Sequence, residues 1–260
     1  MKSSFLCMSL KILFVCNGNI FRSMTAEYCL RDYMQDNRVS ISSAGLTAHP
    51  QEIDPVVLQS LQQLRIDPRK HKQRKLSKRI IEINDIVIAM HKEQQRHIIK
   101  HYGIHVPLFN ELAIGRRTSI KDNNEFTFVS RNAYNAMMRR TVKKIHNRTP
   151  AIAQYIYDRH LLFEDFANGT QRHRNGYPIF ALYETKNTFA FCSINIPEKE
   201  DGHVLVIPRK RYAYFQDIPA HIRNELMQSV AKIGKALHKT HGGYNILVNN
   251  GAASGQYIFH

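Results

Sequence analysis

The stretch CNGNIFRS, residues 16 to 23, places a thiol, a small flexible loop and a guanidinium close together. Cys16 ends the apolar run KILFVC, and Arg22 opens a segment of helical pattern. A loop with inward backbone N–H groups, capped by a helix N-terminus, can hold a tetrahedral oxyanion. The same positive field favours a thiolate at Cys16, and the planar donors of Arg22 can bind two phosphate oxygens. The pattern therefore predicts nucleophilic attack on a phosphate group.

The residues between the thiol and the guanidinium suit a tight turn. Asn17, Gly18 and Asn19 tolerate left-handed backbone angles. A bare C-x5-R spacing arises often by chance, and Cys16 would then be a small apolar residue that ends a buried strand. The preceding strand pattern, the Gly/Asn loop and the following helix pattern favour the phosphate site.

Strand and helix patterns alternate through the first half of the chain, which predicts an α/β fold. Strands are expected at KILFVC, VSISSAG, NDIVIAM and VPLF, and helices at 24–35, 54–64, 92–102 and 131–147. Such alternation predicts a parallel sheet with helices on both faces. Ligands of these folds sit at the carboxyl ends of the strands, which is where Cys16 falls.

The segment VCNGNIFRSMTAE resembles the phosphate-binding loop of the low-molecular-weight protein tyrosine phosphatases. ISSAGL, HKQRKLS and NDIVIAM extend the resemblance over about residues 10–150. It implies a phosphocysteine at Cys16, a phosphate clamp at Arg22, and no metal or other cofactor. The phosphate loop and its supporting hydrogen bonds would then comprise Asn17, Gly18, Asn19, Ile20, Phe21, Ser23, Ser43 and His71. The alternative for His71 is a solvent-facing residue in a basic run.

Phosphate ester cleavage also needs a proton donor for the leaving oxygen. The family places it in an Asp-Pro pair, and the matching segment here is SIKDNNEF. Asp122 is therefore the candidate acid, with Asn123 in place of the proline and without the usual neighbouring aromatic residues. Asp122 could instead be an ordinary loop residue. Glu125 is the nearest substitute.

The cysteines argue for a reducing compartment. Cys7, Cys16, Cys29 and Cys192 form no CxxC pair, so neither a disulfide scaffold nor a zinc site is expected. Phe21 stands where many family members carry a second cysteine, so no disulfide with Cys16 can form inside the loop. Arsenate reduction, which needs further cysteines downstream, is improbable. We expect a cytoplasmic protein.

The second half is rich in strand patterns, followed by a helix at about 219–240 and a final strand, which predicts an α+β domain with an antiparallel sheet. ALYETKNTFAF, GHVLVIPRKRY and YNILVNNGAASGQYIFH resemble the histidine triad (HIT) family over about residues 163–260. The resemblance implies pairing into a homodimer and a purine nucleotide phosphate near His203, Asn249, Gly255, Gln256 and His260.

Two departures alter what the HIT resemblance implies. The sequence reaches only the first histidine of H-x-H-x-H, at His260, and Ser193 stands where the ribose-binding Asp is expected. We therefore expect a truncated or degenerate HIT domain that binds nucleotides without hydrolysing them. The alternative is a docking module, a dimerisation module or a remnant.

Pro150 and the polar residues before it predict an element boundary. The expected organisation is an N-terminal extension at 1–9, a phosphatase-like domain at 10–150, a linker helix at 151–162 and a HIT-like domain at 163–260. No apolar run reaches the roughly 20 residues that span a bilayer, so no membrane partner is expected.

The formal net charge is +16, from 37 Lys and Arg against 21 Asp and Glu, which favours an anionic partner. The basic residues are spread along the chain without an RNA-binding signature, so nucleic acid is not the favoured partner. The leading hypothesis is a cysteine-dependent phosphomonoester hydrolase acting on a phosphotyrosine protein or a small aryl phosphate. The alternative is a nucleotide-binding or scaffolding protein in which both pockets are inactive.

Overall fold

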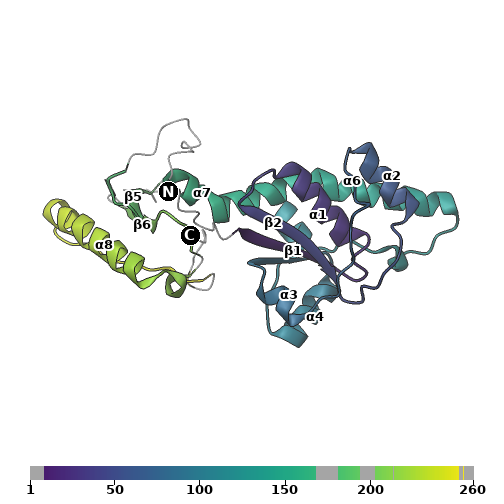
Figure 1. Ribbon diagram of the computed structural model, residues 1–260, viewed down its shortest axis with the longest axis horizontal. Coiled ribbons are helices and arrows are strands. Elements are labelled where there is room, and N and C mark those ends of the chain that lie inside the picture. Colours follow the sequence, from purple (N-terminus) through teal and green to yellow (C-terminus); the bar gives the residue numbers. More distant parts are fainter. Residues whose placement is uncertain (1–8, 168–180, 194–202, 213, 252–253, 255–260) are drawn as a thin grey trace, which may run out of the picture. The chain divides into compact units, whose positions relative to one another are not determined.

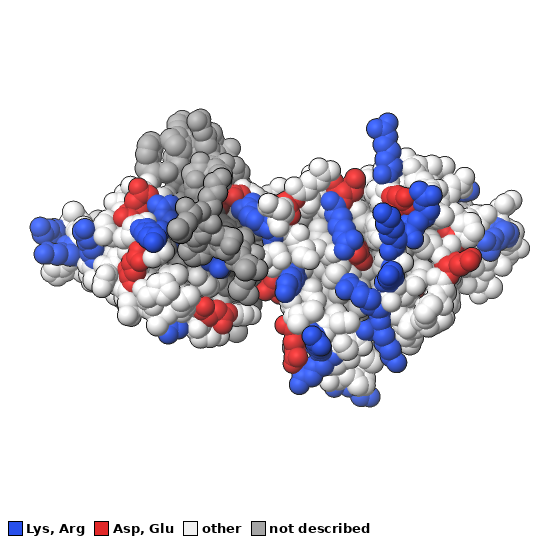
Figure 2. Space-filling view, in the orientation of Figure 1, with Lys and Arg blue, Asp and Glu red and all other residues white. Residues whose placement is uncertain are grey.

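The computed structural model describes residues 9–167, 181–193, 203–212, 214–251 and 254. The chain divides into two compact units, Met1–Tyr155 and Ile156–His260, and each is described by itself. Among the described residues, no helix combines the length and the apolar character that crossing a membrane requires. Figure 2 shows Lys and Arg side chains spread over the visible face, with Asp and Glu side chains among them.

The first unit is built on a parallel sheet with strand order β2-β1-β3. Its strands are β1 (Leu10–Cys16), β2 (Val39–Gly45) and β3 (Ile86–Ala89). The β1–β2 register pairs Cys16 with Gly45, so the carboxyl ends of the two strands lie at the same edge. The expected α/β fold with a parallel sheet is confirmed.

Helices cover both faces of this sheet (Figure 1). Leu13 and Val15 of β1 pack in one core cluster with α3 (Lys78–Glu82) and α4 (Lys92–Tyr102). A second cluster joins α1 (Arg22–Tyr33), α2 (Pro55–Gln63) and the first half of α6. Because side chains alternate along a strand, a buried central strand such as β1 is apolar at nearly every position.

The segment VPLF does not form the expected strand. Leu108 makes a single parallel bridge to Ala89, and the chain then turns directly into α5 (Phe109–Ile114). Phe109 instead packs against Phe14 of β1, with ring centroids 6.2 Å apart. Burial of this aromatic side chain decides the conformation, because a short apolar run fits a strand or a buried helix equally well.

Helix α6 (Arg131–Ile156) runs through Pro150, where the sequence suggests a boundary. Val142, Ile145, Thr149, Ile152 and Ile156 are all buried, at the spacing of one helix face. A proline removes one backbone hydrogen bond, but the packing of this continuous apolar face outweighs the loss.

The second unit begins with a π-helical turn, Tyr157–Leu161, and α7 (Leu162–Ala167). Strands β4 (Tyr183–Glu184), β5 (Thr188–Cys192) and β6 (Val204–Pro208) form an antiparallel sheet in that order. Helix α8 (Ala220–His241) follows a 3₁₀ turn at Phe215–Asp217. Phe189, Phe191 and Ile207 pack with Leu162 and Phe163 in the core. The antiparallel sheet and the long helix are as predicted.

The described residues that follow α8 do not form the expected final strand. Residues 243–250 are all described, and none of them is assigned to a strand. Leu247 is 86% exposed there and Val248 is 58% exposed. The sequence pattern of this segment is typical of a strand, but a strand needs a paired edge, and the sheet of this unit pairs only β4, β5 and β6 among the described residues.

Candidate active site

The chain passes from strand to loop to helix around the sulfur of Cys16. β1 ends at Cys16 and α1 begins at Arg22, so the intervening loop lies at the N-terminus of a helix. The Cys16 residue is 2% exposed. The backbone N–H of Asn19 donates to Cys16 Sγ at 3.3 Å, and Ser23 Oγ lies 2.9 Å from the same atom. The sulfur therefore accepts one backbone hydrogen bond and shares a second with the Ser23 hydroxyl, in which either atom can donate.

The left-handed residue of the loop is Asn19, with φ 53°, and not Gly18. A Cβ added to Gly18 would make only ordinary contacts of 3.5 Å with Gln51 and Ile20. Of the turn residues that the sequence suggests, Asn19 alone takes the conformation that the turn requires, because Asn accepts left-handed angles more readily than other side chains.

The Asn19 side chain connects three segments of the first unit. Its Nδ2 donates to Ser23 Oγ at 3.1 Å and to Ser43 Oγ at 2.6 Å, and its Oδ1 accepts from the backbone N–H of Arg74 at 2.8 Å. Asn19 and Ser43 are fully buried. Buried polar groups that are all hydrogen-bonded fix one conformation, so this network holds the loop in shape.

Glu27 and His71 support the same loop from behind. His71 Nε2 lies 2.7 Å from the Asn19 carbonyl oxygen, and Ser43 Oγ donates to Glu27 Oε2. Burial lowers the pKa of His71 below its ordinary value, so the ring is neutral near pH 7 and its Nε2–H donates. His71 is thus packed against the loop and is not a solvent-facing residue of a basic run. Glu27 was not a sequence candidate, although its buried place on α1 sets it apart from a surface charge.

Asn17 is held from a different helix. Gln94 Nε2, on α4, donates to Asn17 Oδ1 at 2.7 Å. Gln94 is fully buried. The sequence gives no signal for Gln94, because a glutamine in a polar helix segment is usually a surface residue.

Arg22 is 1% exposed and joins the loop to a segment about a hundred positions later. Its Nη1 donates to the Ile120 carbonyl oxygen at 2.8 Å, and its Nη2 pairs with Asp122 Oδ2. Its buried Nε has no hydrogen-bond partner among the residues that the structure describes. An unsatisfied donor on a buried guanidinium is costly unless a ligand meets it, and an oxyanion fits this position.

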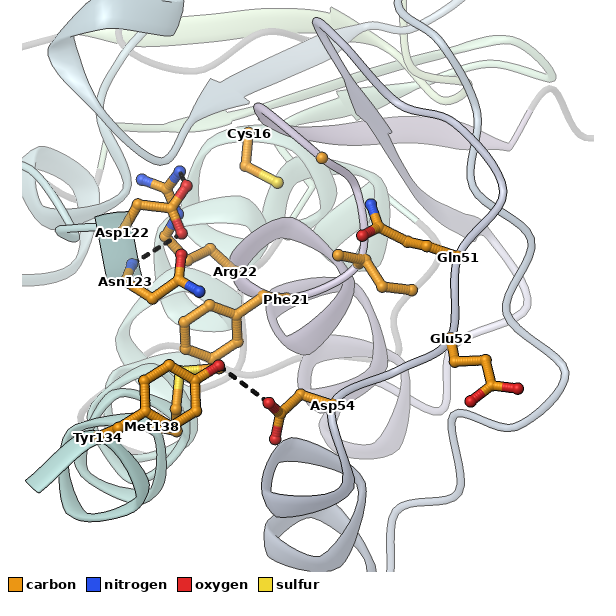
Figure 3. Close-up of a pocket in the computed structure, with 12 residues that line it drawn as sticks. Cys16, Phe21, Arg22, Gln51, Glu52, Asp54, Asp122, Asn123, Tyr134 and Met138 are labelled. Atoms are coloured by element: carbon orange, nitrogen blue, oxygen red, sulfur yellow. Dashed lines mark hydrogen bonds and ion pairs between the residues drawn. The ribbon is translucent and has the colours of Figure 1, made fainter. Parts of the chain in front are cut away.

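The structure brings Asp122 beside Arg22, and both line one cavity (Figure 3). Asp122 Oδ1 accepts from the backbone N–H of Asn123 at 3.0 Å. Glu125 is the alternative candidate acid that the sequence offers, but it is not among the residues that line the cavity. Its Oε1 accepts a hydrogen bond from the Asp122 N–H at 2.6 Å. Of these two carboxylates, Asp122 is the one that lines the cavity.

The cavity has a volume of about 360 Å³ and is lined by charged, polar and apolar side chains. Figure 3 shows Arg22 and Asp122 at one side and Gln51 and Glu52 at the opposite side. The full lining is Cys16, Gly18, Ile20, Phe21, Arg22, Gln51, Glu52, Asp54, Asp122, Asn123, Tyr134 and Met138. Phe21, Tyr134 and Met138 supply the large apolar and aromatic side chains of this lining.

Two aromatic residues line the cavity, and the sequence indicates only one of them, Phe21. Tyr134 of α6 donates from its hydroxyl to Asp54 Oδ2 at 2.9 Å, and Asp54 Oδ1 caps α2 by accepting from the Val56 N–H. Phe21, which the sequence resemblance places in the phosphate loop, lines the same cavity. Phe128 packs edge-on against Tyr134 with ring centroids 5.2 Å apart.

The nucleotide-site residues of the second unit are only partly described. His203 is exposed before β6, and its carbonyl oxygen accepts from the Ser193 N–H at 2.9 Å. Asn249 is exposed outside any helix or strand. Gly255, Gln256 and His260 lie outside the described residues.

Two family models match the chain. The sequence model described as low molecular weight phosphotyrosine protein phosphatase matches residues 11–156, which is more than half of the chain. The chain belongs to this family. A HIT domain follows at residues 175–260. The architecture expected from the two resemblances is confirmed.

The curated relatives match one half of the chain each. A low molecular weight protein-tyrosine-phosphatase of Acinetobacter johnsonii is 35% identical over 34% of this chain and 61% of its own length. An adenylylsulfatase of Arabidopsis thaliana is 35% identical over 34% of this chain and 44% of its own length. An adenosine 5′-monophosphoramidase of Saccharomyces cerevisiae is 35% identical over 32% of this chain and 50% of its own length. The chain spans less than two thirds of the length of these relatives.

Solved structures share the fold of the first unit. A YwlE variant from Bacillus subtilis matches with a TM-score of 0.50 and 22% identity, over 57% of this chain and 99% of that one. The YwlE arginine phosphatase from Geobacillus stearothermophilus gives the same TM-score and identity, over 57% and 93%. At this identity the likeness establishes the fold.

Gly45 tests the packing of the loop. A Cβ on Gly45 would lie 2.3 Å from the Asn17 carbonyl oxygen and 2.8 Å from the Asn19 N atom, both backbone atoms of the loop. We expect Gly45→Ala to displace the loop, lower phosphatase activity at least about tenfold and destabilise the first unit by about 1–3 kcal/mol. Activity assays and thermal unfolding measure both effects. Gly243→Ala, where nothing lies within 4 Å, is the control, and an unaltered Gly45→Ala protein would contradict the expectation.

Proposed function

We propose that the first unit is a phosphomonoester hydrolase that works through a phosphocysteine at Cys16. The observation that carries this is the grouping of Cys16 Sγ, the buried Arg22 guanidinium with its unpaired Nε, and the Asp122 carboxylate around one cavity. The site residues and the domain limits stated from the sequence are part of this proposal. Family membership supports a phosphatase, and the roles of individual residues are inferred from their geometry.

The reaction has two steps. Cys16 attacks phosphorus as a thiolate, the S–P bond forms, and the P–O bond to the leaving group breaks while Asp122 gives its proton to the departing oxygen. Water then attacks phosphorus, Asp122 takes a proton from that water, and the S–P bond breaks to release phosphate. Loop N–H groups and Arg22 stabilise the charge on the equatorial oxygens in both steps.

Substrate binding releases the acid. In the free protein Arg22 pairs with Asp122. A phosphate dianion binds the same guanidinium with two oxygens, so it competes for Arg22 and brings negative charge beside the carboxyl group. Asp122 is then released from Arg22 and can act on the leaving oxygen.

Cys16→Ser and Asp122→Asn test the two roles with p-nitrophenyl phosphate, without added metal. We expect Cys16→Ser to lose at least about 10³-fold in kcat, because the nucleophile is gone. Asp122→Asn should retain most of its kcat/KM on this good leaving group and lose about 10²-fold or more in kcat/KM on phenyl phosphate, because kcat/KM reports the first step, in which the leaving group departs. Full activity of a folded Cys16→Ser protein would contradict the mechanism. Absence of turnover in the unaltered protein would favour the scaffolding alternative.

We propose phosphotyrosine as the substrate class. Phe21, Tyr134 and Met138 provide an apolar and aromatic wall that can pack against an aryl ring. The Acinetobacter johnsonii relative is named a tyrosine phosphatase, while YwlE is named an arginine phosphatase, so both phosphoryl acceptors must be compared.

Variants at Tyr134 test whether the cavity binds phosphotyrosine in preference to phosphoarginine. We expect Tyr134→Ala to raise KM for a phosphotyrosine peptide about tenfold, since the ring contact is worth about 1 kcal/mol or more. Tyr134→Phe, which keeps the ring and loses only the hydrogen bond to Asp54, should stay within about threefold. Steady-state kinetics with phosphotyrosine and phosphoarginine peptides of the same sequence provide the measurement. Preference for phosphoarginine would overturn the substrate proposal.

For the HIT half we propose binding of a purine nucleotide. The support is that relatives matching the chain include adenosine 5′-monophosphoramidases. We expect AMP to bind in calorimetry to the Arg22→Ala protein, in which the phosphatase loop no longer competes for the nucleotide phosphate. Asn249→Ala should weaken this binding about tenfold, as loss of a hydrogen bond to a charged group predicts. No measurable heat with AMP would favour a docking role.

A further inference from the structure

We propose that Glu125 and His91 are positioning residues that hold the general acid Asp122 in place during phosphoryl transfer. The inference rests on the proposed function, because it presupposes that Asp122 donates the proton. It concerns neither the nucleophile nor the phosphate loop, but the segment 119–125, which we call the acid loop.

The acid loop is tied to the start of α4. The Ile120 N–H donates to the Met90 carbonyl oxygen at 2.8 Å, and the Lys92 N–H donates to Ser119 Oγ at 3.1 Å. These bonds fix the first half of the loop. They do not reach Asp122 itself.

Glu125 uses both carboxylate oxygens to fix the second half. Oε1 accepts from the backbone N–H of Asp122 at 2.6 Å, and Oε2 lies 3.3 Å from His91 Nε2. Glu125 thereby closes a reciprocal capping arrangement around the 3₁₀ turn Asn123–Glu125. A carboxylate that accepts a backbone N–H makes a stronger hydrogen bond than a neutral acceptor would.

The orientation of the His91 ring follows from its second hydrogen bond. His91 is the N-cap of α4, and its Nδ1 accepts from the Glu93 N–H at 3.1 Å. Because Nδ1 accepts, the ring N–H is on Nε2, the atom that lies beside Glu125 Oε2. His91 thus connects the rigid helix terminus to the carboxylate that holds Asp122.

The contacts of Glu125 with Asp122 and His91 matter most when substrate is bound. In the free protein Asp122 has two anchors, Arg22 on its side chain and Glu125 on its backbone. When phosphate binds Arg22, the ion pair with Asp122 is lost. The hydrogen bond from the Asp122 N–H to Glu125 then remains. A loosened acid loop would lower the fraction of complexes in which the carboxyl group reaches the leaving oxygen.

Leaving-group dependence distinguishes a positioning role from a merely structural one. A general acid matters little for p-nitrophenyl phosphate, whose leaving group departs readily, and much for phenyl phosphate. We expect Glu125→Ala to lower kcat/KM for phenyl phosphate about tenfold and for p-nitrophenyl phosphate less than twofold. Inhibition by inorganic phosphate, which reports on anion binding at the loop and Arg22 and involves no proton transfer, should change little.

Three further variants make the test specific. Glu125→Gln keeps an acceptor for the Asp122 N–H and should recover most of the phenyl phosphate activity. His91→Ser keeps an N-cap for α4 and removes the contact to Glu125, so it should lose about threefold on phenyl phosphate alone. Glu82→Ala, on the exposed surface of α3, is the matched control and should leave both substrates unaffected.

The outcomes separate this inference from the proposed mechanism. In the first outcome, the loss of kcat/KM in Asp122→Asn depends on the leaving group, but Glu125→Ala and His91→Ser lower kcat/KM equally for both substrates or not at all. The positioning role of Glu125 and His91 is then overturned, and the proposed mechanism stands. If Glu125→Gln is as defective as Asp122→Asn, Glu125 is itself a proton donor, and the positioning role is overturned. If the effect of Asp122→Asn on kcat/KM does not depend on the leaving group, Asp122 is not the general acid, and the positioning role of Glu125 and His91 is overturned as well.

Discussion

The buried guanidinium of Arg22 is the constraint on which the site depends. A cation that is 1% exposed must be paired, because the loss of hydration is otherwise prohibitive. In the free protein the Ile120 carbonyl oxygen and the Asp122 carboxylate satisfy two of its nitrogens, and the third has no described partner. The same charge therefore connects α1 to the acid loop and leaves a position that an oxyanion can fill.

The phosphate loop is rigid because its supports come from several directions. Asn19 and Ser43 share one hydrogen bond, Glu27 accepts from Ser43, and His71 reaches the loop backbone. Gly45 leaves room for this approach, since any side chain there would meet loop backbone. Backbone N–H groups held in a fixed arrangement need no reorganisation during the reaction, which is the property that makes such a loop catalytic.

The acid loop is held in a different way from the phosphate loop. Its contacts are fewer and partly exposed, with Glu125 and His91 at 31% and 19% exposure. Partly exposed hydrogen bonds of this kind each contribute only modestly to stability. A rigid cradle beside a more loosely held acid suits a reaction in which one carboxyl group first gives and then takes a proton.

The sequence by itself determined the contiguous part of the site and the order of the elements. Strand, loop and helix around Cys16 are encoded within residues 10–33, and the alternation of patterns determined the parallel sheet. The resemblance named Ser43, His71 and Asp122 as candidates. Their positions around the loop follow from tertiary packing, because hydrogen bonds such as Arg22 to Ile120 join residues 98 positions apart.

Only the tertiary structure decided the wall of the cavity, the supports and several element limits. Tyr134, Glu27 and Gln94 have no sequence signal, because an aromatic or polar residue on a helix is equally typical of core and surface. VPLF gives way to α5, α6 passes Pro150, and residues 243–250 form no strand. In each case local preferences amount to about 1 kcal/mol or a few, and the burial of neighbouring side chains or the availability of a pairing edge outweighs them.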